Sequence, residues 1–193
     1  MKEPTLTLPP AEAEMVLREY AAAKRILEFG SGGSTVAASR ITGAEAISVE
    51  SDKAWCDMMR DWFKEHPPIA KLDLIHADIG PTREWGYPKT DTHWRQYPDY
   101  PFAPWLKHPE FQPDVVLIDG RFRVGCFIAT LLSIKKSCTI LFDDYEDRPA
   151  YHVVEEFSPV VERAGRMTKF RVKPRKLSAF KMPDLLKIFM KLQ

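Results

Sequence analysis

The stretch RILEFGSGGSTVAAS, from Arg25 to Ser39, carries the clearest pattern in the chain. It begins with an apolar run that contains one acidic residue, Glu28, continues with glycines at positions 30, 32 and 33, and ends in a helix-like pattern. Glycine permits a tight turn and lets a ligand approach the backbone closely, and the start of a helix offers unpaired N–H donors. The stretch therefore predicts a strand, a ligand-binding turn and a helix in succession.

The same alternation of strands and helices continues along the chain. Short apolar runs predict strands at 26–29, 46–50, 72–77, 115–118 and 139–142, and helical patterns cover 11–23, 34–41, 52–65, 124–134 and 149–157. Short apolar strands that alternate with helices are typical of a mostly parallel sheet covered on both faces. The run VVERAGRMTKFRV then predicts a late antiparallel hairpin around Gly165.

Length and composition fit one globular domain. The chain has 193 residues and a net charge of +1, which excludes a global field that recruits nucleic acid or membrane. The three cysteines form no close pair, which favours a reducing compartment and a cytoplasmic location and argues against structural zinc. The N-terminus MKEPTLTLPP has no apolar signal region, and no apolar run approaches the length that spans a membrane.

The C-terminal part of the chain is basic. Between residues 166 and 193, nine Lys and Arg accompany a single acidic residue, Asp184. This pattern is typical of a solvated face and tail, and contact with an anionic partner remains the alternative. One helical face of the tail at 174–193 carries Leu185, Ile188, Phe189 and Leu192. We expect that face to dock on the body of the protein or on a second copy, so a homodimer stays open.

One interval, at about 79–113, interrupts the alternation. Between Pro81 and Pro113 lie seven of the 16 prolines, three of the five tryptophans and three of the six tyrosines. Long loops are usually functional or disordered, and disordered segments are poor in aromatic residues. We therefore expect an ordered insertion over the site, as a lid or substrate wall. The alternative is a surface excursion with its own small cluster.

The glycine turn departs from the dinucleotide-binding pattern. In that pattern, which would begin at Gly30, the third glycine would fall at position 35, where this chain has Thr35. Glu28, two residues before the first glycine, would repel a pyrophosphate. An acid at this place suits a ligand that carries an ammonium or sulfonium charge.

Acidic residues also end the strands that follow. Glu50 stands in ISVESD, Asp78 in LDLIHADIG and Asp119 in PDVVLIDG. Together with the glycine turn, this order resembles the class I S-adenosylmethionine-dependent methyltransferases over Arg25 to about Phe157.

This resemblance implies a Rossmann-like fold with a mostly parallel seven-stranded sheet, helices on both faces and a late antiparallel hairpin. It also implies S-adenosylmethionine as the cofactor. In the family the acid at Glu50 binds the ribose hydroxyls, and the acid at Asp78 often recognises the adenine amino group. The residues placed around the cofactor are Glu28, Gly30, Ser31, Gly32, Ser34, Glu50, Asp78 and Asp119.

The run ILFDDYEDR adds Asp143 and Asp144 at the end of the next strand. Three carboxylates at one rim repel each other unless they are protonated or bridged by a cation, and oxygen ligands suit Mg²⁺. Together with Asp119, the pair resembles the metal-dependent O-methyltransferases of the catechol and macrocin–novobiocin types. The resemblance implies a small-molecule acceptor and Mg²⁺ bound by Asp119, Asp143 and Asp144, with helix capping by Asp143 or Asp144 as the alternative.

The general bases of those enzymes have no counterpart here. The sugar-type enzymes have an Asp where this chain has Arg121, and the catechol-type enzymes have a Lys where it has Phe122. A guanidinium is a poor base and a good anion clamp, so Arg121 and Arg123 favour an acidic acceptor. Alternatively, Arg121 pairs with Asp119 or Asp143 and stands where a metal would. The sequence thus assigns catalytic roles to Asp119, Asp144 and Arg121.

Two further residues, His152 and Asp147, are alternative bases. Three other functions stay open: an NAD-dependent oxidoreductase, a non-catalytic S-adenosylmethionine-binding module, and a nucleic-acid methyltransferase. The first would want a glycine at Thr35. The second is favoured by the missing base. The last rests on the basic tail and the aromatic insertion, and it lacks the Asp/Asn-Pro-Pro-aromatic motif where IDGRF stands, so nucleic acid is not the expected partner.

Overall fold

The computed structural model describes residues 2–176 and 182–190 of the chain. Its main sheet has seven strands in the order β3-β2-β1-β6-β7-β9-β8. These strands are β1 (Arg25–Phe29), β2 (Glu45–Glu50), β3 (Lys71–His76), β6 (Val115–Ile118), β7 (Cys138–Phe142), β8 (Val160–Ala164) and β9 (Met167–Val172). The first five are parallel, and β9 pairs antiparallel with both β7 and β8. The predicted mostly parallel sheet with a late hairpin is confirmed.

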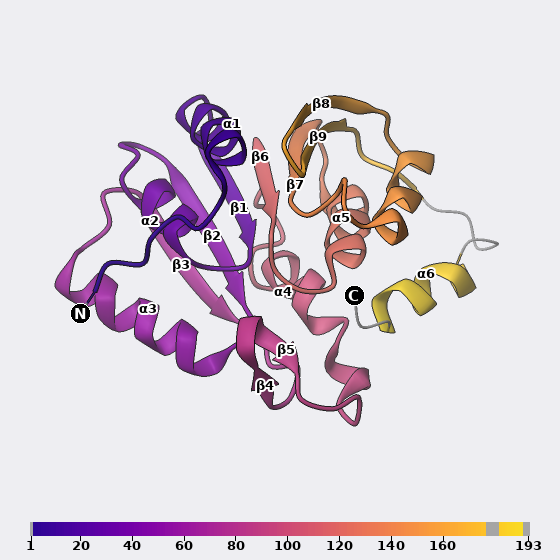
Figure 1. Ribbon diagram of the computed structural model, residues 1–193, viewed down its shortest axis with the longest axis horizontal. Helices are drawn as coiled ribbons and strands as arrows, with labels where there is room; N and C mark the ends of the chain where they lie inside the picture. Colours follow the sequence, from indigo (N-terminus) through magenta and orange to yellow (C-terminus); the bar gives the residue numbers. More distant parts are fainter. Residues whose placement is uncertain (1, 177–181, 191–193) are drawn as a thin grey trace.

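Helices cover both faces of this sheet (Figure 1). They are α1 (Pro10–Ala21), α2 (Gly33–Ser39), α3 (Lys53–Glu65), α4 (Asp99–Lys107), α5 (Arg123–Ser133), α6 (Met182–Met190) and the 3-10 helix η3 (Pro149–Glu156). The faces of β1 follow the two-residue period of a strand. Ile26 packs with Met15 and Tyr20 of α1, while Leu27 and Phe29 pack with the aromatic side chains of α4 and α5.

The interval at 79–113 contains a small hairpin and a helix. The hairpin consists of β4 (Thr82–Arg83), the 3-10 helix η1 (Glu84–Gly86) and β5 (Tyr87–Pro88), and a second 3-10 turn, η2 (Trp94–Gln96), follows. Helix α4 then crosses from β3 to β6, and its Tyr100 and Trp105 are buried in the core. The interval therefore has regular structure. Its helix α4 is the crossover that joins the parallel strands β3 and β6.

The C-terminal helix α6 packs on the body of the molecule. Leu185 and Phe189 are buried, and the Phe189 ring lies 5.0 Å from the ring of Phe102 in α4. Phe189 also covers Gly125 of α5. Ile188 packs against the same cluster, whereas Leu192 lies outside the described residues. In this structure the predicted apolar face thus docks on the chain's own core.

Candidate active site

The carboxyl ends of four parallel strands meet where the order of the sheet reverses. Phe29 of β1 lies in register with Val49 of β2 and Ile118 of β6, and Ile118 lies in register with Phe142 of β7. The loops that follow these strands therefore start at one level, side by side. Ligands of open α/β sheets bind at this kind of switch point.

The loops after β1 and β6 touch backbone to backbone. Gly30 has a φ of +103°, and a Cβ placed on it would lie 2.9 Å from the backbone nitrogen of Gly120. Only glycine combines this left-handed backbone with so close a neighbour. The first glycine of the turn thus serves the contact between two loops.

The next two glycines have different surroundings. A Cβ on Gly32 would meet nothing within 4 Å, while one on Gly33 would lie 2.1 Å from the backbone nitrogen of Leu6. The N-terminal segment therefore crosses Gly33, and the space in front of Gly32 is free for a ligand. Thr35 closes the turn, because its hydroxyl accepts the Gly32 N–H at 2.9 Å. This bond explains the threonine at the position of a third glycine.

Glu50, at the end of β2, is fixed by backbone amides. Its Oε2 accepts the Ser31 N–H at 3.1 Å, and its Oε1 accepts those of Ser51 and Asp52 at 2.7 and 2.8 Å. Burial raises the pKa of Glu50 above its ordinary value, although these hydrogen bonds act in the opposite direction. A carboxylate has about four acceptor positions, so the group can still accept a donor such as a ribose hydroxyl.

Two further acids of the predicted cofactor site, Glu28 and Asp78, differ in exposure. Glu28 is fully buried, its Oε1 accepts the Tyr20 hydroxyl at 2.7 Å, and its Oε2 has no hydrogen-bond partner among the described residues. Burial raises the pKa of Glu28. Asp78 is exposed after β3, and its Oδ1 accepts the Gly80 N–H at 2.9 Å. Ser34 is buried at the start of α2. The free space at Gly32 and the Glu50 carboxylate together fit a ribose-bearing cofactor.

Arginines surround the acids after β7. Arg166, from the turn between β8 and β9, donates to both oxygens of Asp143, from Nε to Oδ1 at 3.1 Å and from Nη2 to Oδ2 at 2.9 Å. Its Nε also lies 3.0 Å from Oδ1 of Asp144, whose Oδ2 lies 2.8 Å from Nη2 of Arg148. Burial raises the pKa of the Asp143 carboxyl, but Arg166 and its other charged neighbours outweigh burial and hold it below the ordinary value.

Arg123, in the first turn of α5, ties the two loops together. Its guanidinium donates to the carbonyl oxygens of Gly120, Asp119 and Asp143 at 2.9, 2.9 and 2.6 Å. It also lies 3.2 Å from Oδ1 of Asp119 and 3.1 Å from Oδ2 of Asp144. The pairing that the sequence suggested for Arg121 thus falls to Arg123.

This arrangement does not fit a magnesium site. Three guanidinium groups already neutralise the three carboxylates that would be the ligands. Within residues 2–176 and 182–190, no group of three or more His, Cys, Asp or Glu side chains is placed to hold a metal ion. The prediction of Mg²⁺ finds no support in this geometry.

Asp119 keeps one third of its side-chain surface in water, unlike Asp143, which keeps none. Most of the carboxyl group is nevertheless surrounded by protein atoms, and this burial raises its pKa to about 7; the Arg123 guanidinium opposes the shift, and the nearby Asp143 adds to it. Asp119 is therefore both partly accessible and able to exchange a proton near neutral pH.

Arg121 differs from the other arginines at this edge. It is 7% exposed, its Nε has no hydrogen-bond partner, and no described carboxylate forms an ion pair with it. Its guanidinium carbon lies 3.8 Å from the ring centroid of Tyr87 in β5. Burial raises the pKa of Tyr87, but Arg121 and Arg148 outweigh burial and lower it. The Tyr87 ring therefore lies in a positive field.

The hairpin of β4, η1 and β5 forms the wall beside Glu50. The Ser51 hydroxyl donates to the carbonyl oxygen of Gly86 at 3.0 Å, which joins the hairpin to the loop after β2. A cavity of about 430 Å³ opens along Arg83, Glu84, Trp85 and Tyr87. This volume suits a small ligand.

Strained backbone gathers at this site. Among the described residues, three that are not glycine have positive φ: Trp85 at 62°, Phe122 at 51° and Asp144 at 55°. All three lie in the hairpin or in the loops after β6 and β7. Strain of this kind clusters where function constrains the backbone.

Two residues that the sequence offered as bases lie apart from this centre. His152 contacts the Tyr145 carbonyl through Nε2 at 3.1 Å, and its ring packs on Tyr145. Asp147 is exposed. The sequence reasoning missed Tyr87, Arg148 and Arg166, because no local spacing connects them to the strand ends that they reach.

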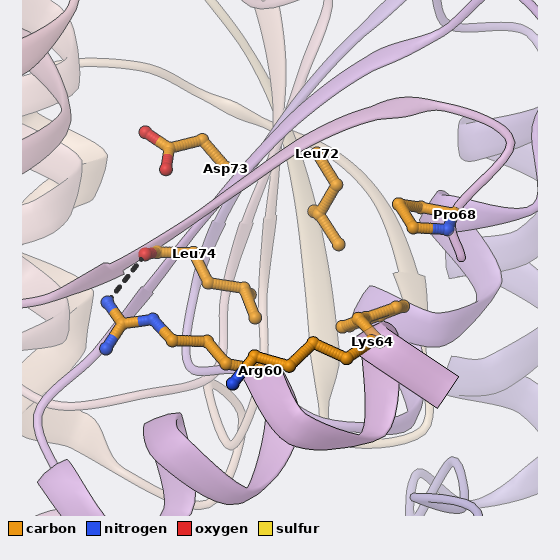
Figure 2. A pocket seen from close by; sticks show the side chains of 7 residues that line it. Arg60, Lys64, Pro68, Leu72, Asp73 and Leu74 are labelled. Atoms are coloured by element: carbon orange, nitrogen blue, oxygen red, sulfur yellow. Dashed lines mark hydrogen bonds between the residues drawn. The ribbon is translucent and has the colours of Figure 1, made fainter. Parts of the chain in front are cut away.

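A second cavity, of about 310 Å³, lies at the edge strand β3 (Figure 2). It is bordered by Arg60, Phe63 and Lys64 of α3 and by Leu72 and Leu74 of β3. Arg60 reaches over it and donates to the Leu74 carbonyl at 3.0 Å. The cavity contains no acidic cluster and no glycine turn, so we assign it no part in the chemistry.

Known structures share this fold. A methyltransferase-like protein from Silicibacter pomeroyi is 46% identical, with 98% of each chain covered and a TM-score of 0.92. The O-methyltransferase TomG from Streptomyces achromogenes, in complex with S-adenosylmethionine, is 14% identical over 89% of this chain and 82% of its own, with a TM-score of 0.56. An O-methyltransferase from Bacillus cereus, in complex with S-adenosylhomocysteine, is 12% identical over 87% and 84%, with a TM-score of 0.57.

The 46% identity to the first protein shows the family, whereas the low identities to the other two show only a shared fold. No protein-family model and no curated protein matches the chain. The chain belongs to the class I S-adenosylmethionine-dependent methyltransferases. Over the described ranges, no helix has both the length and the apolar character needed to cross a bilayer.

Proposed function

We propose that the protein transfers the methyl group of S-adenosylmethionine to an oxygen of a small anionic acceptor, such as a carboxylate, a phosphate or a uronic acid. The cofactor, when bound, supplies the electrophilic methyl group. The proposal rests on two neighbouring features: the glycine turn with Glu50, and the hairpin cavity, whose lining residue Tyr87 packs against Arg121.

On the cofactor side, Glu50 would accept the ribose hydroxyls from a position fixed by three backbone amides. The free space at Gly32 leaves room for the ligand along the turn. Glu28 has no exposed surface, so it would hold the turn in place through the hydroxyls of Thr35 and Ser34 rather than touch the cofactor. Asp78 follows β3 on the exposed side, where we expect the adenine.

The choice of acceptor rests on Arg121. A buried guanidinium without a carboxylate partner is costly unless an anion completes it. Arg121 is buried, its Nε is unpaired, and its side chain packs on the Tyr87 ring that borders the cavity. Guanidinium groups bind carboxylate and phosphate through two parallel hydrogen bonds. An anionic acceptor would therefore be held at this wall, with its hydroxyl directed toward the glycine turn.

The acceptor proton would pass to Asp119. This carboxylate is partly exposed at the end of β6, and its raised pKa suits proton transfer near neutral pH. Asp144 would act through its neighbours, because it fixes Arg148 and Arg123 beside the same loop.

The first experiment is a calorimetric titration with S-adenosylmethionine, with NADH as the control. We expect micromolar binding of S-adenosylmethionine alone; binding of NADH alone would contradict the assignment. Release of S-adenosylhomocysteine is then measured with hydroxylated carboxylates, sugar phosphates and their neutral esters.

Arg121→Met tests the acceptor side directly. It should raise the KM for anionic acceptors at least tenfold and leave S-adenosylmethionine affinity unchanged, while Arg163→Met, on the exposed hairpin of β8 and β9, should change neither. Equal turnover of neutral and charged acceptors would exclude the anion clamp. Cofactor binding without turnover on any acceptor would support the non-catalytic module.

We also propose a cytoplasmic location. Cys56, Cys126 and Cys138 are all buried and unpaired. Free thiols persist in reducing compartments. Fractionation of cells, followed by detection of the protein, tests the location.

A further inference from the structure

Arg123 makes more polar contacts at this edge than any carboxylate there. Its side chain is 4% exposed, and its guanidinium lies 3.2, 3.9 and 3.1 Å from oxygens of Asp119, Asp143 and Asp144. A single internal cation thus faces all three acids that end β6 and β7. Three backbone carbonyl oxygens of the two loops hold it in place.

Arg166 completes the charge balance from a distant part of the chain. It donates two hydrogen bonds to Asp143, whose side chain has no exposed surface. Bidentate pairs of this kind are the strong form of the arginine–carboxylate contact. Arg148 adds a third positive charge at Asp144. The three acids therefore meet three guanidinium groups.

We propose that Arg123 and Arg166 take the place of a divalent cation in this chain, so that the protein works without a metal. A magnesium ion requires oxygen ligands at about 2.0–2.1 Å in octahedral geometry. Here both oxygens of Asp143 already accept hydrogen bonds from Arg166, at 3.1 and 2.9 Å, and Oδ2 of Asp144 lies 3.1 Å from Nη1 of Arg123. An added divalent cation would have to displace these groups and then face their charge in a buried setting.

A metal ion could both neutralise the three acids and bind the acceptor. With arginines in its place, these two tasks fall to different residues. The buried Arg123 guanidinium neutralises the acids, and its Nε, Nη1 and Nη2 already donate to three backbone carbonyl oxygens, so it cannot also bind two oxygens of an acceptor. Binding of the acceptor is then left to Arg121, which forms no ion pair with a described carboxylate and whose Nε has no hydrogen-bond partner. The inference goes beyond the proposed function, because it holds whichever acceptor is used.

The first test is calorimetry on the wild-type protein with MgCl₂ and with MnCl₂. We expect no stoichiometric binding up to millimolar concentration, and the same S-adenosylmethionine affinity with and without a chelator. Stoichiometric binding of either metal that disappears in Asp144→Asn would overturn the proposal. Failure of the proposed function would appear separately, as loss of S-adenosylmethionine binding in metal-free buffer.

The second test is thermal unfolding of Arg166→Gln, with and without millimolar MgCl₂. The matched control is Arg163→Gln on the same hairpin, where the exposed arginine pairs with Glu146. Arg166→Gln should lower the Tm and gain a rise in Tm with Mg²⁺ that neither the wild type nor Arg163→Gln shows. Adding Asp143→Asn should abolish that rise. An unchanged Tm in Arg166→Gln, or an equal Mg²⁺ rise in the wild type, would contradict the proposal. If Arg166→Gln does not fold, the wild-type calorimetry decides.

Discussion

At the residue scale, adjacent glycines of the turn serve different purposes. Gly33 is a packing residue, because the backbone of the N-terminal segment crosses it, whereas Gly32 faces open space. Both are part of the motif that predicted a ligand-binding turn. The motif alone does not separate them, because the segment that covers Gly33 lies more than twenty residues earlier in the chain.

Alanine substitutions should separate these roles. Gly33→Ala places a Cβ about 2 Å from backbone atoms of Thr5 and Leu6, so it should lower the Tm or displace the N-terminal segment. Gly32→Ala should leave the Tm nearly unchanged and weaken S-adenosylmethionine binding, because its methyl group enters the free space. Thermal unfolding and calorimetry on both variants check this. Equal Tm values for the two variants would contradict the packing role of Gly33.

Glu50 should carry a measurable part of the cofactor affinity. Glu50→Ala removes the acceptor for the ribose hydroxyls, and loss of a charged hydrogen-bond partner costs about 1–3 kcal/mol, or roughly 5-fold to 150-fold in affinity. Glu45→Ala, at the other end of the same strand, is the control. Calorimetry with S-adenosylmethionine measures both. An unchanged dissociation constant for Glu50→Ala would remove this assignment.

Asp119 should make stability depend on pH. Its pKa in the folded protein is about 7, against an ordinary value of 3.8. Between these values the folded state holds a proton that the unfolded state has lost, so the contribution of Asp119 to stability falls as pH rises from about 4 to about 7. The Tm of Asp119→Asn should therefore rise relative to the Tm of the wild type when the pH is raised from 5 to 8. The exposed Asp61→Asn should show no such trend. A constant difference between Asp119→Asn and wild type would exclude the raised pKa.

The predictable part of the site consists of residues at strand ends. Glu50, Asp119 and Asp143 could be placed together from sequence, since parallel strands bring their carboxyl ends to one edge. Arg166 could not, because it reaches Asp143 across 23 positions through a turn whose geometry no local pattern specifies. The same limit applies to Tyr87, which meets Arg121 from the hairpin.

At the element scale, prolines in the interval at 79–113 made helix α4 hard to predict from the sequence. Helix α4 begins after Pro98 and contains Pro101 and Pro104. Proline is tolerated in the first turn of a helix, while one farther along removes a backbone hydrogen bond, so the sequence pattern favoured a loop. Burial of Tyr100 and Trp105 in the core stabilises the helix against that loss. Packing thus overrides a local signal that sequence reasoning follows.

Helix α6 should contribute stability through one aromatic side chain. Phe189 is 7% exposed and packs against Phe102, so Phe189→Ala should destabilise the protein by about 3 kcal/mol, within the range for large buried side chains. Leu186→Ala on the same helix is the control, because Leu186 is 48% exposed. Chemical denaturation of both variants measures the difference. Equal midpoints would show that the docking of α6 contributes little.

At the scale of the whole molecule, cofactor binding should stabilise the fold by mass action. S-adenosylmethionine at 100 times its dissociation constant adds about 2.7 kcal/mol. For a chain of this size that corresponds to a rise in Tm of about 5–10 °C. Hydrogen exchange should slow in the loops after β1 and β2 and remain unchanged in β8 and β9. A Tm that does not respond to the cofactor would contradict binding at this edge.

The outer strand β3 is protected against neighbouring molecules. Lys71 and Ala77 donate their N–H groups toward β2. Backbone groups alternate in direction along a strand, so those of Leu74 point away from β2, to the free edge of the sheet. There Arg60 donates a hydrogen bond to the Leu74 carbonyl (Figure 2). Beside it, Lys107 and His108 contact the Asp73 carboxylate at 3.0 and 2.7 Å. Unprotected edges serve as templates for aggregation. Two copies of this protein should therefore resist joining their sheets at β3, and a homodimer would have to form through another surface.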